Sequence, residues 1–285
     1  MAAPPAPPVR TNFPGRVLGL LATGAVVLGI AFVIAPRALA AREGASFGDA
    51  DALRGEFRTA FDTYWRTGES AFPADLQRIV DYWFRYHLSK AVIAGVLLFV
   101  LISLTVLLWR AFVRTHESST NGRLALGAAG VVTTALVLFA AMLVIANIQG
   151  AIAPFASLLP FLIDGPPDPA LAETLDQVRQ RLAEAATSGE RAPAALNVML
   201  DDFTRYHVVV AVAAALVAAD LLALSVLMWR KSTAQPARSR AKRVLTAFGA
   251  LSILTAMATI VVAVANTTNA GDPASGLAAL FDGGW

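Results

Sequence analysis

Two histidines at equivalent positions are the first residues whose type and spacing suggest chemistry. His87 and His207 each follow an Arg-Tyr pair, and they are two of only three histidines in the chain. Two imidazoles on neighbouring helices can hold a b-type haem or a metal ion between them. A redox subunit with haem or metal between His87 and His207 is therefore one hypothesis. The alternative is that each imidazole bonds to a lipid phosphate or to a neighbouring carbonyl.

A single acid within an apolar stretch is the second candidate. Asp220 lies 14 residues after Tyr206, and acids at membrane depth are costly and usually face a bundle interior or a wet cavity. It is either the ion or proton site of a transporter or channel, or a hydrogen-bonded acid that fixes helix packing. We expect it to face hydroxyl groups inside the bundle, drawn from Ser103, Thr105, Thr133, Thr134, Thr255 and Thr259.

Several other chemistries have no support in the residues. The chain has no cysteine, which excludes disulfides, thiolate metal sites and a cysteine nucleophile. It contains no phosphate-binding loop, no zinc-type histidine spacing and no nucleophile elbow. A net charge of +3 is too small and too unevenly placed to indicate nucleic acid as a partner. We therefore expect a protein that is not an enzyme.

The elements that must position these residues are membrane-spanning helices. Of the 285 residues 56% are hydrophobic and 15% charged, against roughly 45–50% and about 25% in soluble domains. A bilayer core needs about 20 apolar residues in a helix, and five segments meet that need: 17–35, 90–112, 124–147, 206–229 and 244–266. The first could instead be a signal peptide cleaved after Ala40. A sixth apolar stretch, 151–163, is too short to cross and is interpreted as interfacial or re-entrant.

Charge placement predicts the orientation. Basic residues dominate the tail 1–16 and the linkers 113–123 and 231–243, whereas the segment 148–205 is rich in acids and the tail 267–285 has two acids and no base. Positive loops stay in the cytoplasm, so we expect a cytoplasmic N-terminus and an external C-terminus. The abundance of Ala and Arg is typical of a high-GC bacterial genome, which suggests the bacterial cytoplasmic membrane.

The chain also resembles itself at a constant offset of 120 residues. The segment 81–87 matches 201–207, and Trp109-Arg110 matches Trp229-Arg230. This predicts a parallel duplication with repeat 1 at 17–112, repeat 2 at 124–230, and the span 244–266 as a lone fifth helix. Tyr86 and Tyr206 each lie 23 residues before their Trp, about 35 Å of helix. These four aromatics are expected to anchor the two membrane interfaces.

The repeat predicts the shape of the external part. Pro73 and Pro193 suit the first turn of a helix, so the second and fourth spans are expected to be lower halves of long helices. One-faced apolar stripes there and on a preceding helix predict a four-helix extracytoplasmic cap. The stripes are Leu76, Val80, Trp83; Leu196, Leu200, Phe203; Leu53, Phe57, Phe61, Tyr64; and Leu171, Leu175, Val178, Leu182. The external tail is expected to lie on the outer leaflet or to dock on this cap.

Four further polar residues are given local roles. Arg85 and Arg205 are expected to anchor the membrane interface beside the interface tyrosines and to pair with Asp81 and Asp201, one helical turn away. Asn147 and Asn266 end two spans and are expected to cap those helices.

The fold class predicted is thus an all-α integral membrane protein with five spans and an external helical cap. The function that fits best is a scaffold, assembly or accessory subunit, acting through the cap and the bundle on a protein partner or a second copy.

Overall fold

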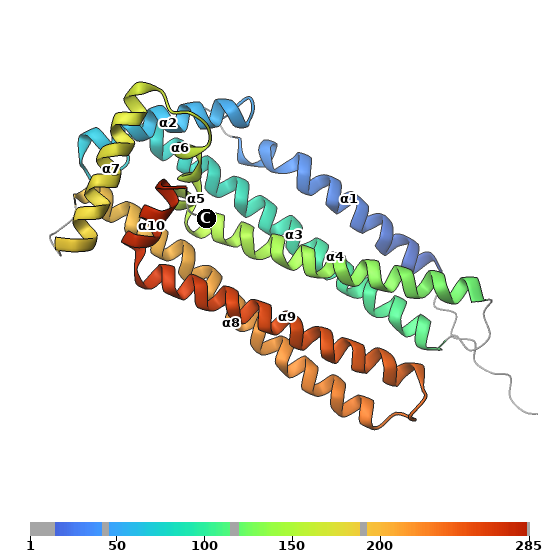
Figure 1. The fold of residues 1–285 in the computed structure, drawn as a ribbon. Coiled ribbons are helices and arrows are strands. Elements are labelled where there is room, and N and C mark those ends of the chain that lie inside the picture. The colour runs from blue at the N-terminus through green and yellow to red at the C-terminus, as the bar shows by residue number, and fades with distance from the viewer. Residues whose placement is uncertain (1–14, 42–45, 115–119, 189–192, 284–285) are drawn as a thin grey trace, which may run out of the picture.

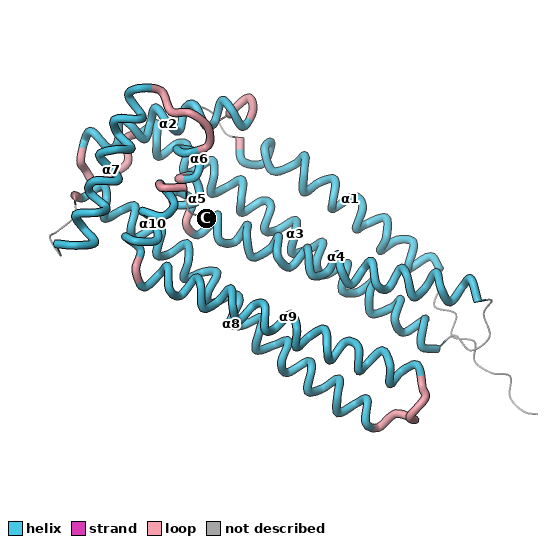
Figure 2. The backbone as a smooth tube through the Cα atoms, in the orientation of Figure 1, coloured by secondary structure: helices cyan, strands magenta, loops and turns pink. Residues whose placement is uncertain are grey.

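The computed structural model describes residues 15–41, 46–114, 120–188 and 193–283, and within these ranges the regular structure is entirely helical (Figures 1 and 2). The helices are α1 Gly15–Ala40, α2 Ala50–Thr67, α3 Ala74–Arg114, α4 Thr120–Ile152, α5 Pro154–Leu158, α6 Pro160–Ile163, α7 Pro169–Ser188, α8 Ala194–Thr233, α9 Arg240–Gly271 and α10 Pro273–Phe281.

Five of these helices are long and apolar enough to cross a membrane: α1, α3, α4, α8 and α9. Each contains one of the five spans predicted from the sequence, so that prediction is confirmed. The chain is a multi-pass membrane protein in contact with the lipid bilayer.

The two longest helices begin where proline predicts. α3 starts directly after Pro73 and α8 directly after Pro193, and they run for 41 and 40 residues. Proline has no N–H to leave unsatisfied and its fixed φ suits a helix start. Both helices therefore extend well beyond the predicted spans 90–112 and 206–229.

The long helices associate as two hairpins and one additional helix. α3 packs along α4, α8 packs along α9, and α1 packs along α3, whereas α4 and α8 meet only over a short stretch. Figure 1 shows the α8–α9 hairpin separating from the α3–α4 hairpin toward the end marked by their linkers. Side chains still join the two hairpins there, since the ring centroids of Trp109 on α3 and Phe248 on α9 lie 5.3 Å apart.

The end of the bundle opposite these linkers carries a compact group of helices that we call the head: α2, α5, α6, α7 and α10 with the first turns of α3 and α8. One hydrophobic core joins all of these elements. Every residue of the four predicted apolar stripes is either buried in this core or packed against it. The helical spacing of those stripes was thus a correct guide to burial.

The stretch 151–163 belongs to the head. It forms the end of α4 followed by α5 and α6, each short helix opening with a proline at Pro154 or Pro160. Phe155, Leu158 and Leu162 are at most 1% exposed within the head core. The apolar side chains of this segment therefore pack inside the head, and its interfacial or re-entrant position stays a prediction.

Phe155 lies in an aromatic cluster near the middle of the head. Its ring centroid is 4.8 Å from that of Phe72, 5.9 Å from Tyr64, and 6.4 Å from both Phe57 and Phe61. These pairs include edge-to-face, tilted and stacked arrangements, and such aromatic contacts stabilise a core beyond the burial of their area. Burial raises the pKa of Tyr64 to about 12, so this phenol stays neutral in the head.

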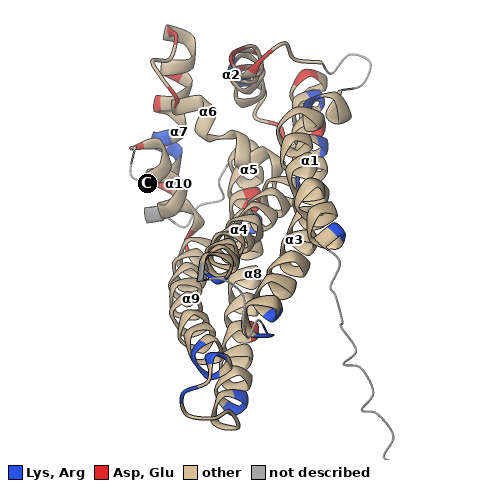
Figure 3. Cartoon of the chain, turned by 90° about the vertical axis from the view of Figure 1, so that its right-hand side faces the viewer, with Lys and Arg blue, Asp and Glu red and all other residues tan. Residues whose placement is uncertain are grey.

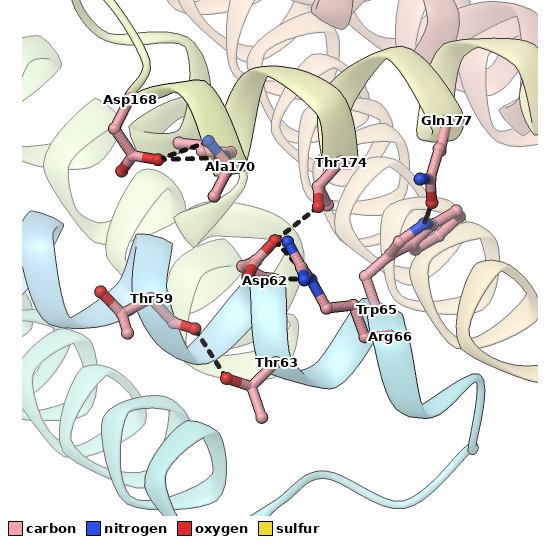
Figure 4. A network of polar contacts seen from close by, with 10 residues as sticks. Thr59, Asp62, Thr63, Trp65, Arg66, Asp168, Ala170, Thr174 and Gln177 are labelled. Atoms are coloured by element: carbon pink, nitrogen blue, oxygen red, sulfur yellow. Dashed lines mark hydrogen bonds and ion pairs between the residues drawn. The ribbon is translucent and has the colours of Figure 1, made fainter.

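Polar contacts join α2 to α7 at the rim of the head (Figure 4). The Asp62 carboxylate accepts a hydrogen bond from the Thr174 hydroxyl and forms an ion pair with Arg66, and Trp65 Nε1 donates to Gln177 Oε1 at 3.2 Å. Thr174 is nearly fully buried, so its hydroxyl needs this acceptor. These bonds set the register of the two helices that cover the aromatic cluster.

The helix α10 closes the head from the other side. Leu277, Leu280 and Phe281 are buried, and the Arg179 guanidinium of α7 donates to the Phe281 carbonyl at 3.1 Å. Asp272 precedes α10, and its carboxylate accepts the Ser275 N–H. Hydrogen bonds from the side chain and the backbone of Ser275 lower the pKa of Asp272. Of the two positions expected for this tail, docking on the head is the one found.

The acids gather at one end of the molecule, whereas basic residues occur at both ends. Figure 3 shows Asp and Glu concentrated on the head, and Lys and Arg at the far ends of α8 and α9. The basic residues of the far end include Arg110, Arg123, Arg230, Lys231, Arg238, Lys242 and Arg243. Within the described ranges the acids of the chain lie in the head, with Asp220 of α8 the exception.

Candidate functional site: paired histidines and an exposed acid

Each candidate histidine is held by an asparagine of its own hairpin. His87 Nδ1 on α3 lies 3.1 Å from Asn147 Oδ1 on α4, and His207 Nδ1 on α8 lies 2.8 Å from Asn266 Oδ1 on α9. Each asparagine amide donates to the carbonyl one turn earlier, at 2.7 Å and 2.9 Å. The asparagine oxygen therefore faces the ring, and Nδ1 must be the nitrogen that carries the proton.

The second ring nitrogen of each histidine, Nε2, is buried and has no hydrogen-bond partner among the described residues. In the neutral tautomer set by the asparagine, Nε2 carries the lone pair and is the atom that could accept a proton or a metal. No cluster of three or more His, Cys, Asp or Glu side chains able to hold a metal occurs in the described ranges.

Close packing fixes both rings. Trp83 lies edge-on to His87 at 4.7 Å between centroids, and Phe203 does the same for His207 at 4.4 Å. On the α4 side the His87 ring lies against Gly150, where a Cβ would come within 2.7 Å of the ring. Gly150 is therefore the residue that lets α4 approach His87.

The two imidazoles are thus turned toward two separate asparagines and are not hydrogen-bonded to a common partner. The hypothesis of a haem or metal between His87 and His207 stays a prediction. What the geometry does provide is a rigid contact that ties α3 to α4 and α8 to α9 at matching depths.

The expectation that Asn147 and Asn266 cap helices was wrong. α4 continues to Ile152 and α9 to Gly271, so both asparagines lie inside their helices. Their partners are the histidines, which lie 60 and 59 residues earlier in the chain. That near-constant spacing was the signal that could have identified the pairs from the sequence.

A second matched contact joins the same helices near their other ends. The Trp109 ring lies against Gly130, and the Trp229 ring lies against Gly249, each closer than a Cβ would permit. Trp109 Nε1 donates to Thr134 Oγ1 at 3.1 Å, while Ser225 donates to the Gly249 carbonyl at 2.9 Å. The four aromatics Tyr86, Tyr206, Trp109 and Trp229 stay predicted interface anchors.

The expected Asp–Arg pairs one turn apart are not formed. The Arg85 side chain donates to the Ala40 carbonyl at 2.9 Å and so ties the end of α1 to α3. Arg205 pairs instead with Asp202 at 3.0 Å. The second oxygen of Asp202 accepts the Ala156 N–H at 2.8 Å, because the N-terminus of α5 offers unsatisfied donors there.

Asp220 corrects the remaining sequence expectation. Its side chain is exposed, whereas Ala214, Ala218 and Ser225 are the buried residues of this part of α8. At 3.6 residues per turn Asp220 points about 200° away from Ala218. It therefore faces outward from the bundle, and no described hydroxyl hydrogen-bonds to it.

Comparison of the chain with models of protein families, with curated proteins and with solved structures found no match. The function must accordingly be argued from the geometry.

Proposed function

We propose that this protein is a non-enzymatic accessory or assembly subunit that binds another membrane-embedded protein through the outward face of α8. The observation that carries the proposal is Asp220. A carboxyl group on the outer surface of a span would meet lipid, at a cost of about 2.5–3.5 kcal/mol on insertion scales. A partner helix that supplies a hydrogen-bond donor at that depth removes much of this cost.

The neighbours of Asp220 suit such a helix. Leu216 and Leu227 share its face and are 63% and 44% exposed. Ala219 and Ala223 are exposed beside it, and small residues four apart let two helix backbones approach closely. The face therefore combines close approach, apolar contact and one strong hydrogen-bonding group.

The partner is better described as a different chain than as a second copy. A two-fold axis along the membrane normal would place Asp220 against Asp220 at the same depth. Two like charges facing each other in a low-dielectric setting repel. A helix bearing a Lys, Arg, Asn, Gln or hydroxyl side chain has no such conflict.

The transporter alternative requires Asp220 to line a path for ions. Its outward direction supports an interface instead, because a path within this chain would need the carboxylate inside the bundle. An ion path could then exist only between this chain and its partner, which again makes the chain a subunit.

We propose that the head is extracytoplasmic and the N-terminus cytoplasmic in a bacterial cytoplasmic membrane. The support is that the α8–α9 linker, remote from the head, has basic residues and no acid, since such linkers stay inside. The head would then offer a second, external contact surface to the partner.

We propose further that the chain arose by duplication, with units that begin at α2 and α7. The supporting observations are the equivalent His–Asn and Trp–Gly contacts within α3–α4 and within α8–α9. Pro154 and Pro273 also follow the two asparagines at the same distance and open the short helices α5 and α10. In this frame α1 is the additional helix, in place of the fifth span.

Replacing Asp220 by Leu is expected to weaken association with the partner by roughly threefold to thirtyfold, because an intramembrane hydrogen bond contributes about 0.6–2 kcal/mol. A photo-crosslinking residue at position 216 in native membranes reports the contact. The same residue at position 99 on α3, away from this face, is the control. A crosslinked partner that forms equally well with Asp220→Leu, or no adduct specific to position 216, would contradict the proposal.

The redox alternative has a direct test. We expect the purified protein to show no Soret absorbance, because each histidine bonds an asparagine of its own hairpin and the two rings share no hydrogen-bond partner. A Soret band that disappears in His87→Leu and in His207→Leu would instead assign a bis-histidine haem.

A further inference from the structure

We propose that the crevice between the two hairpins, at the basic end of the bundle, binds one anionic phospholipid. The acyl chain would occupy an apolar cavity among α3, α4 and α9. The phosphate would lie at three arginines at its mouth. This proposal does not depend on the partner of α8, which lies on a different face.

The cavity has the size and lining of an acyl-chain site. Its volume is about 480 Å³, within the usual range of ligand pockets. Its walls are almost wholly apolar, with Val131, Ala135 and Leu138 from α4 opposite Ala247 and Leu251 from α9. Trp109 of α3 and Phe248 of α9 meet edge-to-face at 5.3 Å.

The few polar groups on this wall are already satisfied. The Thr134 hydroxyl donates to the Gly130 carbonyl at 2.7 Å and accepts from Trp109 Nε1 at 3.1 Å. Away from Arg243 at the mouth, a polar ligand would find no free donor or acceptor in the cavity and would lose its hydration without compensation. A hydrocarbon chain loses nothing and gains the burial of its surface.

The mouth of the crevice carries the positive charge that would bind the phosphate. A second cavity of about 330 Å³ adjoins the first, since Arg243 and Val244 line both. Arg123 of α4 and Arg240 of α9 complete its basic rim together with Arg243. Neither Arg123 nor Arg243 forms an ion pair with another described residue. Arginine recognises phosphate through a planar fork of donors.

The two cavities together match one molecule. A phospholipid has an apolar chain and a phosphate joined at the interface, and basic pockets between helices on the cytoplasmic side suit anionic headgroups. Free phosphate would use only the mouth, and an uncharged lipid would use only the crevice. The shared lining of the two cavities favours a ligand that needs both.

Lipid retention tests the proposal. The full-length protein is reconstituted in nanodiscs of phosphatidylcholine with phosphatidylglycerol, extracted into detergent, and its bound lipid is counted by native mass spectrometry. We expect one phosphatidylglycerol retained in preference to phosphatidylcholine. The pair Arg123→Gln and Arg243→Gln should lower that retention roughly thirtyfold, at about 1 kcal/mol for each basic residue.

Two control variants distinguish lipid binding at this site from general attraction of anionic lipid to the basic surface. The pair Arg230→Gln and Lys231→Gln removes the same charge from the same end without touching either cavity, and it should retain the lipid. Ala247→Phe keeps every arginine but fills the crevice, and it should lose the lipid as the first pair does.

Each contrary result overturns the proposal. Equal retention of the two lipids, or an equal loss in the control pair, would mean that only surface charge attracts lipid. Displacement by soluble glycerol phosphate at similar concentration would mean that the site takes a phosphate and not a lipid. Circular dichroism of every variant confirms that the helices are retained.

Discussion

Replacing Phe155 by Ala is expected to destabilise the head by about 3–5 kcal/mol, the usual cost of removing a fully buried aromatic side chain. Phe155 is 1% exposed, and four other aromatic rings surround it. The cavity left behind would lie where α2, α3 and α5 meet. Denaturant titration of the purified protein, followed by tryptophan fluorescence of Trp65 and Trp83, measures the loss.

Phe99→Ala is the matched control for that substitution. Phe99 lies on α3 and is 72% exposed, so its removal leaves no cavity within the chain. We expect a change of stability well below that of Phe155→Ala. Equal effects of the two substitutions would show that the head is not packed around Phe155.

The second large effect is expected from adding a single methyl group. Gly150→Ala would place a Cβ within 2.7 Å of the His87 ring, and overpacking of this kind costs about 1–3 kcal/mol. The ring has little freedom to move, because Asn147 holds Nδ1 and Trp83 packs edge-on to the ring at 4.7 Å between centroids. The melting temperature in detergent should fall, and α4 should separate from α3.

Gly95→Ala on α3 is the control, since nothing lies within 4 Å of its position. It should be neutral or stabilising by up to about 1 kcal/mol, because alanine favours a helix over glycine. The double variant with His87→Ala tests the cause. If the added methyl group strikes the ring, the two destabilisations should fall short of additivity by about 1 kcal/mol or more.

The sequence predicts where the helices lie and which faces of the head helices are buried, but not which faces of the membrane spans pack together. Apolar length alone determined the five spans, and proline at 73 and 193 determined where α3 and α8 begin. Stripes such as Leu171, Leu175, Val178 and Leu182 revealed the head core, because water on the other face of α7 demands polar residues there. In the membrane that contrast disappears, since lipid and protein neighbours are equally apolar.

Asp220 shows the consequence. The residues around Asp220 are apolar on every side of α8, so the sequence does not indicate which side packs against α9. The expectation that Asp220 faces the interior therefore rests only on the general behaviour of acids in membranes. The His–Asn pairs were missed for another reason. Asn147 and Asn266 stand at the ends of two apolar segments, which is typical of helix caps, whereas their role follows from the spacing of 60 and 59 residues from each to its histidine.

Because α10 completes the head core, the head can finish folding only after α9 and α10 have been synthesised. The α10 residues Leu277, Leu280 and Phe281 complete a core that α2, α5 and α7 have already begun, yet a ribosome makes α10 after all of them. Until α9 has inserted, the nascent chain must display an unfinished apolar surface at the membrane. A chaperone or protease that binds exposed apolar surfaces could bind every molecule during that interval. A delay in the insertion of α9 would lengthen the interval.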